Sequence, residues 1–433
     1  MKGRRRRMTE EVELTRGTRH FTWGMNMIRI RLVLCAAVVG LAPGLSPGTA
    51  RANFITTVVM SGLDNPRGLA FGPDGGLYVA EAGRGGPGPS VLLPPRETVS
   101  YGTSGAVSRL LGGVQQRVLT GLPSLALASG GNARGLVDIG FSASGEAFGV
   151  ISFGGNPALR STLGPVGADF GRLVQLPLGG GTLRSIADLA DYESARDPDG
   201  RGPDSQPYGL LVTPSGFVVA DAGGNDILRV TAGGVISTLA VLPERSNPLP
   251  FGPPMVQAVP TTVAIGPDGA YYVGELTGAP HVPGFANVYR LDPLTGDRTV
   301  AFSGFTNIID LAFGPDHSLY VLQVSRDGLA SPTGPAPGAL IRVDPITGAR
   351  TTLLSEGLDF PGGVAVGPDG SIYVSNFGTS AGRGQVLQLT PVPEPTSLGL
   401  AGVGILSLLI SGWWRKRSRC PAVATSQGAT PKT

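Results

Sequence analysis

Short apolar segments separated by turn residues recur along the chain, and residues 206–243 show this pattern most clearly. Here the segments 209–213, 217–220, 227–230 and 235–242 are rich in Val, Ile and Leu, and Gly, Pro, Ser, Asn and Asp separate them. Segments of this length with such boundaries are typical of β-strands. A single four-stranded sheet cannot bury both of its faces, so the pattern predicts that the sheet stacks against similar sheets.

Similar units do occur along the chain. Turns of the Pro-Asp-Gly type recur, each after a short apolar segment and before one rich in Tyr or Val, at residues 73–75, 214–216, 267–269, 315–317 and 368–370. A degenerate copy, GLVDIGFSASGEAFGVISFG, lies between the first two turns. Six copies spaced roughly fifty to seventy residues apart are typical of the blades of a β-propeller. The sequence therefore predicts an all-β fold, a six-bladed β-propeller.

The two ends of the repeated region predict how the ring closes. The last copy has only three strands and ends at residues 385–389, so it lacks an outer strand. Residues 55–63, ITTVVMSGL, resemble residues 350–358, RTTLLSEGL, which precede the last copy. We therefore expect the N-terminal strand to complete the last blade, and we place the propeller at residues 53–391.

Residues 1–52 have the features of an N-terminal extension followed by a secretory signal peptide. Arg29 and Arg31 precede an apolar run at residues 32–41, and Ala50-Arg51-Ala52 matches a small-residue cleavage site. The run is too short to span a membrane, which favours a signal peptide over an anchor. The sequence leaves the start of translation open between Met1, Met25 and Met27.

Residues 392–433 contain a second targeting pattern. Pro393-Glu394-Pro395 is followed by an apolar run at 398–414 and by the basic cluster Arg415-Lys416-Arg417, which fits a transmembrane helix with its C-terminal side in the cytoplasm. This order resembles the bacterial PEP-CTERM sorting signal. The resemblance implies that an exosortase-type enzyme processes the chain, so that the protein is held only transiently in the inner membrane and reaches the cell surface or the polymer around it. A plain single-pass anchor is the alternative, and both place the propeller outside the cytoplasm.

The charge of the propeller region differs from that of the whole chain. The formal net charge is +3, but residues 53–391 hold 19 Arg, no Lys and 27 Asp and Glu, a net charge of about −8. A domain of this sign does not follow a phosphate backbone, so nucleic acid is not an expected partner. The absence of Lys excludes Schiff-base chemistry there, and Cys35 and Cys420 both lie outside the repeats.

The lengths of the predicted connections distinguish two faces of the propeller. With the strands of a blade named A to D, the A–B and C–D turns are tight. Long connections fall between strands B and C or between strand D and the next strand A, at residues 83–105, 153–170, 191–206, 243–259, 277–286 and 325–338. Because strands alternate in direction, these long connections emerge on one face. Long loops on a rigid scaffold commonly carry binding sites.

Polar residues gather where strands meet this elaborated face. The ends of the predicted B strands carry Glu81, Asp221, Glu275, Gln323 and Asn376, with Ile151 in the second blade, and the starts of the A strands carry Arg67, Arg134, Tyr208, Thr262 and Asp310. We consider a ligand-binding ring at the channel mouth formed by Arg67, Glu81, Tyr208, Asp221, Glu275, Asp310, Gln323 and Asn376. Glu81, Asp221, Glu275 and Asp310 are candidate ligands of a hard cation such as Ca²⁺. The alternatives are that these side chains accept hydrogen bonds within their own blade, or that crowded carboxylates act as acid or base.

Other candidate motifs are weak. The acidic stretch 191–206 contains Asp197-Pro198-Asp199-Gly200, which is similar to a piece of a calcium-binding loop but lacks the ligand spacing and the closing Glu of an EF-hand. Turn chemistry is the alternative explanation. Residues 378–382 match G-x-S-x-G but have no helix after them. His317 lies in a tight turn, so that His281 is the one conceivable general base. No catalytic residue is assigned.

Several blocks of the propeller region resemble the ScyD/ScyE family of secreted six-bladed propellers, which belongs to the NHL/SMP-30-like class. These blocks include YESARDPDGRGPDSQPYGLLV, VPTTVAIGPDGAYYVGELTG and GGVAVGPDGSIYVSNFG. The resemblance implies a secreted module that binds a small molecule or polymer or supports assembly, in matrix production or in production of a scytonemin-type pigment. The alternative is a metal-dependent hydrolase similar to the sugar lactonases, with Glu81, Asp221, Glu275, Asp310 and Asn376 as metal ligands.

Overall fold

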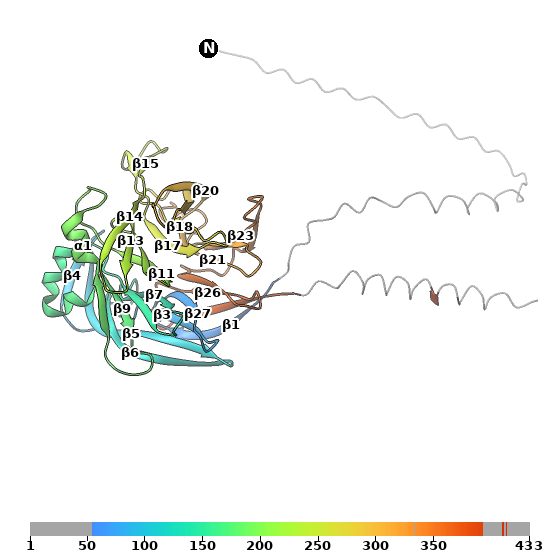
Figure 1. Cartoon of the computed structure of the whole chain (residues 1–433), viewed down its shortest axis with the longest axis horizontal. Coiled ribbons are helices and arrows are strands. Elements are labelled where there is room, and N and C mark those ends of the chain that lie inside the picture. Colours follow the sequence, from blue (N-terminus) through green and yellow to red (C-terminus); the bar gives the residue numbers. More distant parts are fainter. Residues whose placement is uncertain (1–53, 333, 393–408, 411–412, 414–433) are drawn as a thin grey trace, which may run out of the picture. The chain divides into compact units, whose positions relative to one another are not determined.

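The computed structural model of the protein describes residues 54–332, 334–392, 409–410 and 413 (Figure 1). Six antiparallel sheets, each of at least four strands, follow one another along the chain and form the blades of a propeller. The predicted all-β class and the six-bladed arrangement are confirmed. The degenerate copy in the sequence is the second blade.

The blades contain the following strands. Blade one has β2 (Pro66–Phe71), β3 (Leu77–Glu81), β4 (Ser90–Leu93), β5 (Glu97–Leu111) and β6 (Val114–Ala126); blade two has β7 (Leu136–Phe141), β8 (Ala147–Ile151), β9 (Arg172–Leu176) and β10 (Arg184–Asp188); blade three has β11 (Pro207–Thr213), β12 (Gly216–Asp221), β13 (Asp226–Thr231) and β14 (Ile236–Val241). Blade four has β17 (Pro260–Ile265), β18 (Tyr271–Glu275), β19 (Ala286–Leu291) and β20 (Arg298–Phe305); blade five has β21 (Ile308–Phe313), β22 (Leu319–Gln323), β23 (Ala339–Val343) and β24 (Arg350–Leu354); blade six has β25 (Gly363–Val366), β26 (Ile372–Asn376), β27 (Gly384–Pro391) and β1 (Phe54–Leu63).

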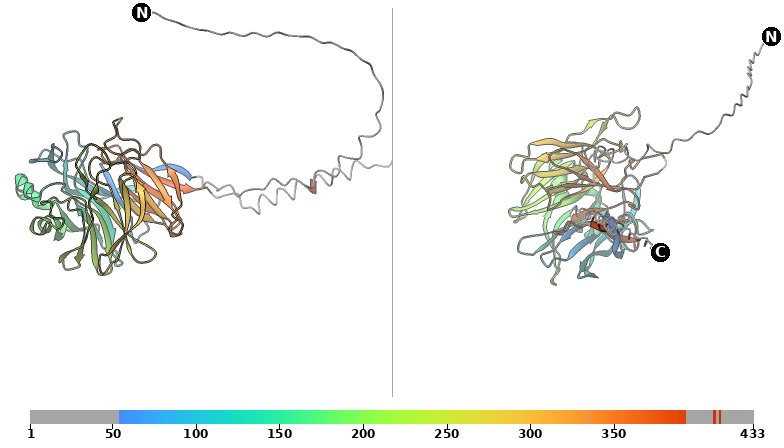
Figure 2. Two further views of the ribbon diagram at one scale, coloured as in Figure 1. Left: turned by 90° about the horizontal axis from the view of Figure 1, so that it is seen from above. Right: turned by 90° about the vertical axis from the view of Figure 1, so that its right-hand side faces the viewer.

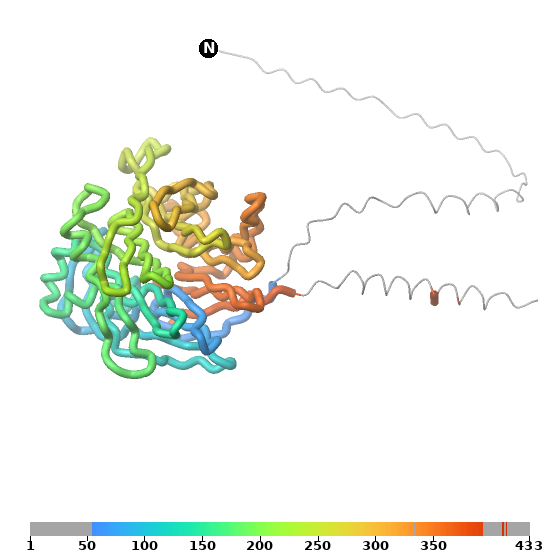
Figure 3. Tube along the Cα trace, in the orientation of Figure 1, coloured from blue at the N-terminus to red at the C-terminus, as the bar shows by residue number. Residues whose placement is uncertain are grey.

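The N-terminal strand closes the ring, as predicted. Strand β1 pairs antiparallel with β27, in a register that runs from Phe54 opposite Pro391 to Leu63 opposite Gly384. In Figures 2 and 3 the blue start and the red end of the described chain lie side by side in this last blade. The pairing leaves blade six with four strands and covers the edge that β27 would otherwise expose.

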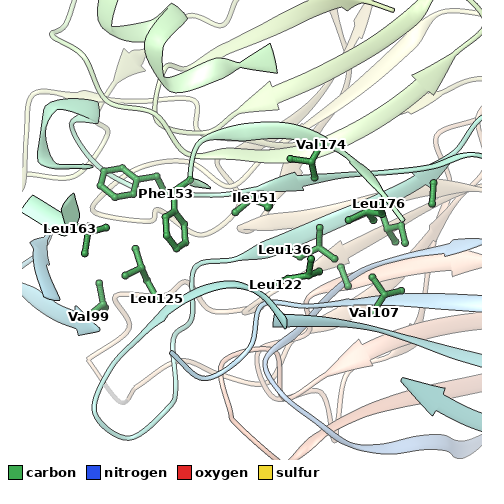
Figure 4. Close-up of a cluster of buried hydrophobic side chains, with 14 of the residues drawn as sticks. Val99, Val107, Leu122, Leu125, Leu136, Ile151, Phe153, Leu163, Val174 and Leu176 are labelled. Atoms are coloured by element: carbon green, nitrogen blue, oxygen red, sulfur yellow. The ribbon is translucent and has the colours of Figure 1, made fainter. Parts of the chain in front are cut away.

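The core is divided among the interfaces between blades. In β12, Phe217 and Val219 pack against blade two, whereas Val218 and Ala220 pack against blade four, because successive side chains of a strand point to opposite faces. Among the described residues, each of the six interfaces between neighbouring blades holds a buried apolar cluster. Figure 4 shows the cluster between blades one and two, where Leu136, Ile151 and Phe153 pack together.

The long connections of the elaborated face carry regular structure of their own, which the sequence analysis did not foresee. Residues 83–105 contain β4 and the start of β5, and residues 153–170 contain the 3-10 helical segment η1 (Pro157–Asp169). The connection at 191–206 begins inside helix α1 (Leu189–Arg196), and that at 243–259 forms a hairpin of β15 (Arg245–Ser246) and β16 (Met255–Val256). Local pairing satisfies backbone groups that long irregular loops would leave open.

Both targeting segments fall largely outside the described residues. These are the signal peptide within residues 1–52 and the sorting segment at 392–433, of which residues 392, 409–410 and 413 are described. Within the described part of the chain, no helix combines the length and the apolar character needed to cross a membrane.

Candidate functional site

The polar residues at the ends of the B strands accept hydrogen bonds from the segment that enters their own blade. Such bonds join Glu81 Oε2 to the Asp64 N–H (2.7 Å), Asp221 Oδ1 to the Gln206 N–H (2.6 Å), Gln323 Oε1 to the Thr306 N–H (3.0 Å) and Asn376 Oδ1 to the Asp359 N–H (2.7 Å). Glu275 instead accepts from the Asn287 N–H at 2.7 Å and pairs with Arg245. Buried backbone donors need such acceptors. This geometry agrees with the alternative in which these side chains cap their own blades.

Two of the capping carboxylates also have charged partners that neutralise them. Arg117 of β6 donates to Glu81 Oε2 at 2.6 Å and to Asp64 at 3.0 Å, and Arg245 of β15 pairs with Glu275. Asp221 has no such partner among the described residues, and burial raises its pKa to about 6 despite bonds from the Ser205 hydroxyl and three backbone N–H groups. These contacts occupy both carboxylate oxygens of Glu81 and of Asp221, whereas Glu275 Oε2 is buried without a hydrogen-bond partner.

Asp310 takes part in a different arrangement, together with a residue that the sequence analysis missed. Asp310 of β21 accepts from the Val364 N–H of blade six at 2.8 Å, and Asp138 of β7 accepts from the Leu210 N–H of blade three at 2.7 Å. Each carboxylate thus joins its own blade to the next one. The sequence signal was the match of Val137-Asp138-Ile139 in the degenerate copy to Ile309-Asp310-Leu311.

The four carboxylates considered as metal ligands are not brought together. Among the described residues, the acidic group of three whose oxygens lie within 4.8 Å of one another is Glu193, Asp197 and Asp199, in the connection before blade three. A cation held by Glu81, Asp221, Glu275 and Asp310 therefore stays a prediction, and their geometry gives it no support.

A cavity of about 220 Å³ lies where the innermost strands begin. Part of its lining comes from the starts of A strands: Arg67, Tyr208, Thr261 and Ile309. Another part comes from the residues that directly follow the ends of B strands: Ser152, Ala222, Leu276 and Val324. We call it the axial pocket. Of the eight predicted ligand-binding residues, Arg67 and Tyr208 line it, and Glu81, Asp221, Glu275, Asp310, Gln323 and Asn376 do not. The alternation of side chains along a strand explains the difference: the cap faces the blade, and the next residue faces the pocket.

Arg67 is the most unusual group of the axial pocket. Its side chain is buried and donates through Nη1 to the Tyr208 hydroxyl at 3.3 Å and through Nη2 to the Ala133 carbonyl at 3.2 Å. Its Nε has no hydrogen-bond partner, and no ion pair in the described part of the chain includes Arg67. Nearby, Arg134 pairs with Glu97 at 2.9 Å. The pocket therefore has a buried positive charge that no acidic side chain among the described residues neutralises.

The other walls of the axial pocket combine apolar and neutral polar groups that the sequence did not mark as a site. Val137, Leu329 and Phe360 are apolar, whereas Asn132, Gln206 and Thr379 offer amide and hydroxyl groups. A larger cavity, of about 450 Å³, lies between blades six and one, but its lining is mainly glycine and apolar side chains with Tyr373 and Gln388. Only the axial pocket of these two combines charge with convergent polar groups.

Comparison with known proteins identifies the sorting segment. Residues 391–416 match the family model described as the PEP-CTERM protein-sorting motif. The motif indicates a secreted protein that is sorted to the cell surface, with a C-terminal anchor that an exosortase processes. No curated protein matches the sequence.

Solved structures that resemble the chain are propellers of diverse activity. They include virginiamycin B lyase from Staphylococcus aureus (15% identity, 79% of this chain and 90% of that chain covered, TM-score 0.41). A predicted gluconolactonase has 11% identity, coverage of 79% and 93%, and a TM-score of 0.47. The PQQ-bound aldose sugar dehydrogenase from Streptomyces coelicolor has 13% identity, coverage of 78% and 98%, and a TM-score of 0.44. At these identities the likeness concerns the fold alone.

Proposed function

We propose that the protein is an exported binding propeller whose axial pocket holds the anionic group of a small organic acid or of an acidic sugar at a polymer end. The protein acts at the cell surface, after a transient stay in the inner membrane through its C-terminal segment. Its role in matrix or pigment production is the one that the resemblance to the ScyD/ScyE family implies.

The observation that carries the proposal is the unpaired guanidinium of Arg67. A buried charge without a counter-charge raises the free energy of the folded protein. An anion that pairs with this charge removes part of that cost, and this contributes to its binding affinity. The guanidinium presents donors in a planar fork, which suits a carboxylate or sulfate better than a neutral group. Arg134 lies beside it in the same lining and adds a second positive charge, which Glu97 partly offsets.

The size and the walls of the pocket restrict the ligand. A volume of about 220 Å³ is below the range of roughly 300–1,000 Å³ that is usual for drug-sized ligands, so the site suits one ring or one short acid. Ile309, Val324 and Phe360 give it apolar walls, and Tyr208 and Gln206 offer hydrogen bonds that orient a hydroxylated ligand. A ring that carries one acidic group and one or two hydroxyls matches these features.

The test is a binding screen on the full-length protein, with uronic acids, phenolic acids and the neutral amides of the same compounds. We expect at least one acid to bind and to raise the melting temperature, and its amide not to bind. Arg67→Gln should weaken binding of that acid at least tenfold, because the charge-assisted pair is lost. The matched control is Arg290→Gln, which removes an exposed arginine paired with Asp268 in a tight A–B turn. Equal binding of the acid by the Arg67→Gln variant would refute the proposed site.

A further inference from the structure

The connection between blades two and three contains an acidic cluster that the axial pocket does not involve. Glu193 of α1 turns inward and is buried, and Asp197 and Asp199 follow it in the turn after the helix. One oxygen of each residue lies within 4.8 Å of the others. The turn itself accounts for some of their hydrogen bonds: Asp197 accepts from the Gly202 N–H at 3.0 Å, and Asp199 accepts from the Arg201 N–H at 2.9 Å.

A second observation, independent of the turn, concerns Asp226. This residue begins β13 and is fully buried, and neither of its carboxylate oxygens has a hydrogen-bond partner. Such an orphaned carboxylate is rare in native proteins and calls for a partner. Turn chemistry does not explain it, because Asp226 lies on a strand and its oxygens bind no amide.

Asp226 and the acidic cluster face the same small space. A Cβ atom built on Gly224 would lie 3.0 Å from Glu193 Oε2 and 3.5 Å from Asp226 Oδ1, so both oxygens border one point that glycine leaves open. Asn225 lies between Gly224 and Asp226 in the sequence, and its side-chain amide donates to Asp199 Oδ2 at 2.8 Å. This bond holds Asp199 to the same corner of blade three. The carboxylates of α1, of the following turn and of β13 thus converge.

The chain supplies no positive charge to this convergence. None of Glu193, Asp197, Asp199 and Asp226 forms an ion pair among the described residues, and the neighbouring Arg201 pairs instead with Glu244. Uncompensated carboxylates at this spacing repel one another, which destabilises the connection unless a cation binds.

We propose that Glu193, Asp197, Asp199 and Asp226 form a Ca²⁺ site that fastens the connection between blades two and three to β13. The donor set consists of oxygens alone, from a helix, a turn and a strand, which suits the six to eight oxygen ligands and flexible geometry of Ca²⁺ better than the strict octahedron of Mg²⁺. The site is separate from the axial pocket, so that it stands or falls independently of the proposed function.

The experiment uses the full-length protein after removal of metals by a chelator and dialysis. Titration calorimetry with CaCl₂ should give one site per chain with a dissociation constant on the order of 10⁻⁴ M, as in extracellular calcium modules. The melting temperature should rise with CaCl₂ and much less with MgCl₂ at the same concentration. No change with CaCl₂ up to about 10 mM, well above the range of such modules, would overturn the proposal.

Two substitutions test the assignment of residues. Asp226→Asn keeps the shape of the side chain and removes its charge, so we expect at least a tenfold loss of Ca²⁺ affinity and no response of the melting temperature to CaCl₂. The metal-free variant should melt no lower than the metal-free wild type, because an unpaired buried charge is removed, and this separates loss of the site from loss of the fold. Asp191→Asn is the matched control, since this exposed carboxylate lies on the same helix but pairs with Arg160, and it should leave Ca²⁺ affinity within about twofold. Unchanged Ca²⁺ binding by the Asp226→Asn variant, or equal responses to CaCl₂ and MgCl₂, would overturn the assignment.

Discussion

The carboxylate that joins blades five and six should make stability depend on pH. Asp310 accepts hydrogen bonds from the N–H groups of Val364 and Leu311 and from the Thr262 hydroxyl. Burial nevertheless raises the pKa of its carboxyl from the ordinary value of 3.8 to about 6. The folded state therefore holds this proton more tightly than the unfolded state does. As the pH rises from about 4 to about 6, Asp310 loses stabilising free energy, and above this window the loss is complete.

The size of the effect follows from the shift. A rise of about two pKa units corresponds to about 3 kcal/mol, since one unit is about 1.36 kcal/mol. Asp310→Asn removes the titration, so the free energy of unfolding of the variant, relative to wild type, should increase by about 3 kcal/mol between pH 4 and pH 8. Asp138 adds to the effect in the same direction, because its own burial and, to a lesser extent, the charge of Asp310 raise the pKa of Asp138. The absolute effect of the substitution at one pH is less informative, since Asn places an NH₂ group opposite a backbone donor.

The assay is urea unfolding of both proteins, followed by far-ultraviolet circular dichroism at several pH values between 4 and 8. Asp268→Asn is the control. Burial of Asp268 raises its pKa, but the bonds from Arg290 and the Ala270 N–H outweigh this effect, so the pKa of Asp268 is lowered. The stability that Asp268 contributes is lost only below its unfolded pKa of 3.8, outside the pH range of the assay. A pH-independent difference between wild type and the Asp310→Asn variant would refute the argument that burial dominates at this carboxylate.

Two further predictions concern ring closure. Leu63→Ala removes a fully buried side chain from the interface of blades six and one, and it should lower the free energy of unfolding by roughly 2–5 kcal/mol in urea titrations. The control Val58→Ala changes a half-exposed side chain of the same strand and should alter the free energy of unfolding by less than about 0.5 kcal/mol, so that equal effects would contradict closure through β1. Asn65→Gly keeps the left-handed backbone at φ 50° but removes side-chain hydrogen bonds to the Gly83 and Gly130 carbonyls. The same titration should show that the free energy of unfolding falls by roughly 1–3 kcal/mol, and an unchanged urea midpoint would mean that water replaces these bonds.

The fold could be predicted from the sequence because its determinants are local and repeated. Strand alternation and turn residues lie within a few positions of one another, as in 217–220, and six similar copies reinforce each weak signal. Closure could be predicted because residues 55–63 repeat the pattern of 350–358. The secondary structure inside the long connections could not, since helix α1 and strand β4 occur once and have no second copy in the chain to support them.

The candidate site was predictable only in part, because a shift of one residue along a strand changes the face to which a side chain points. The polar ends of the B strands drew attention to Asp221 and Glu275, but the residues that line the axial pocket there are their apolar successors, Ala222 and Leu276. Arg67 and Tyr208, which lie at the starts of A strands, do line the axial pocket, and their role in binding stays a prediction. The burial and lack of an ion-pair partner of Arg67 depend on contacts between distant segments, which no local pattern contains.

The charged residues of this propeller differ mainly in whether the chain itself supplies their partners. In the tight A–B turns, Asp74, Asp268 and Asp316 each pair with an arginine of the C strand in their own blade. Since such pairs satisfy both members, they need no ligand, and a substitution there should affect stability alone.

Arg67 and Asp226 are buried without a counter-charge from the described chain. A buried charge is stabilised by hydrogen bonds from neutral groups, by a bound group of opposite sign or, for a carboxylate, by uptake of a proton. The guanidinium of Arg67 has hydrogen bonds to the Tyr208 hydroxyl and the Ala133 carbonyl, and the proposed acid would add the opposite charge that these neutral groups lack. Asp226 can take up a proton, and for this reason Ca²⁺ titration of the Asp226→Asn variant, rather than its stability alone, decides between a proton and a cation.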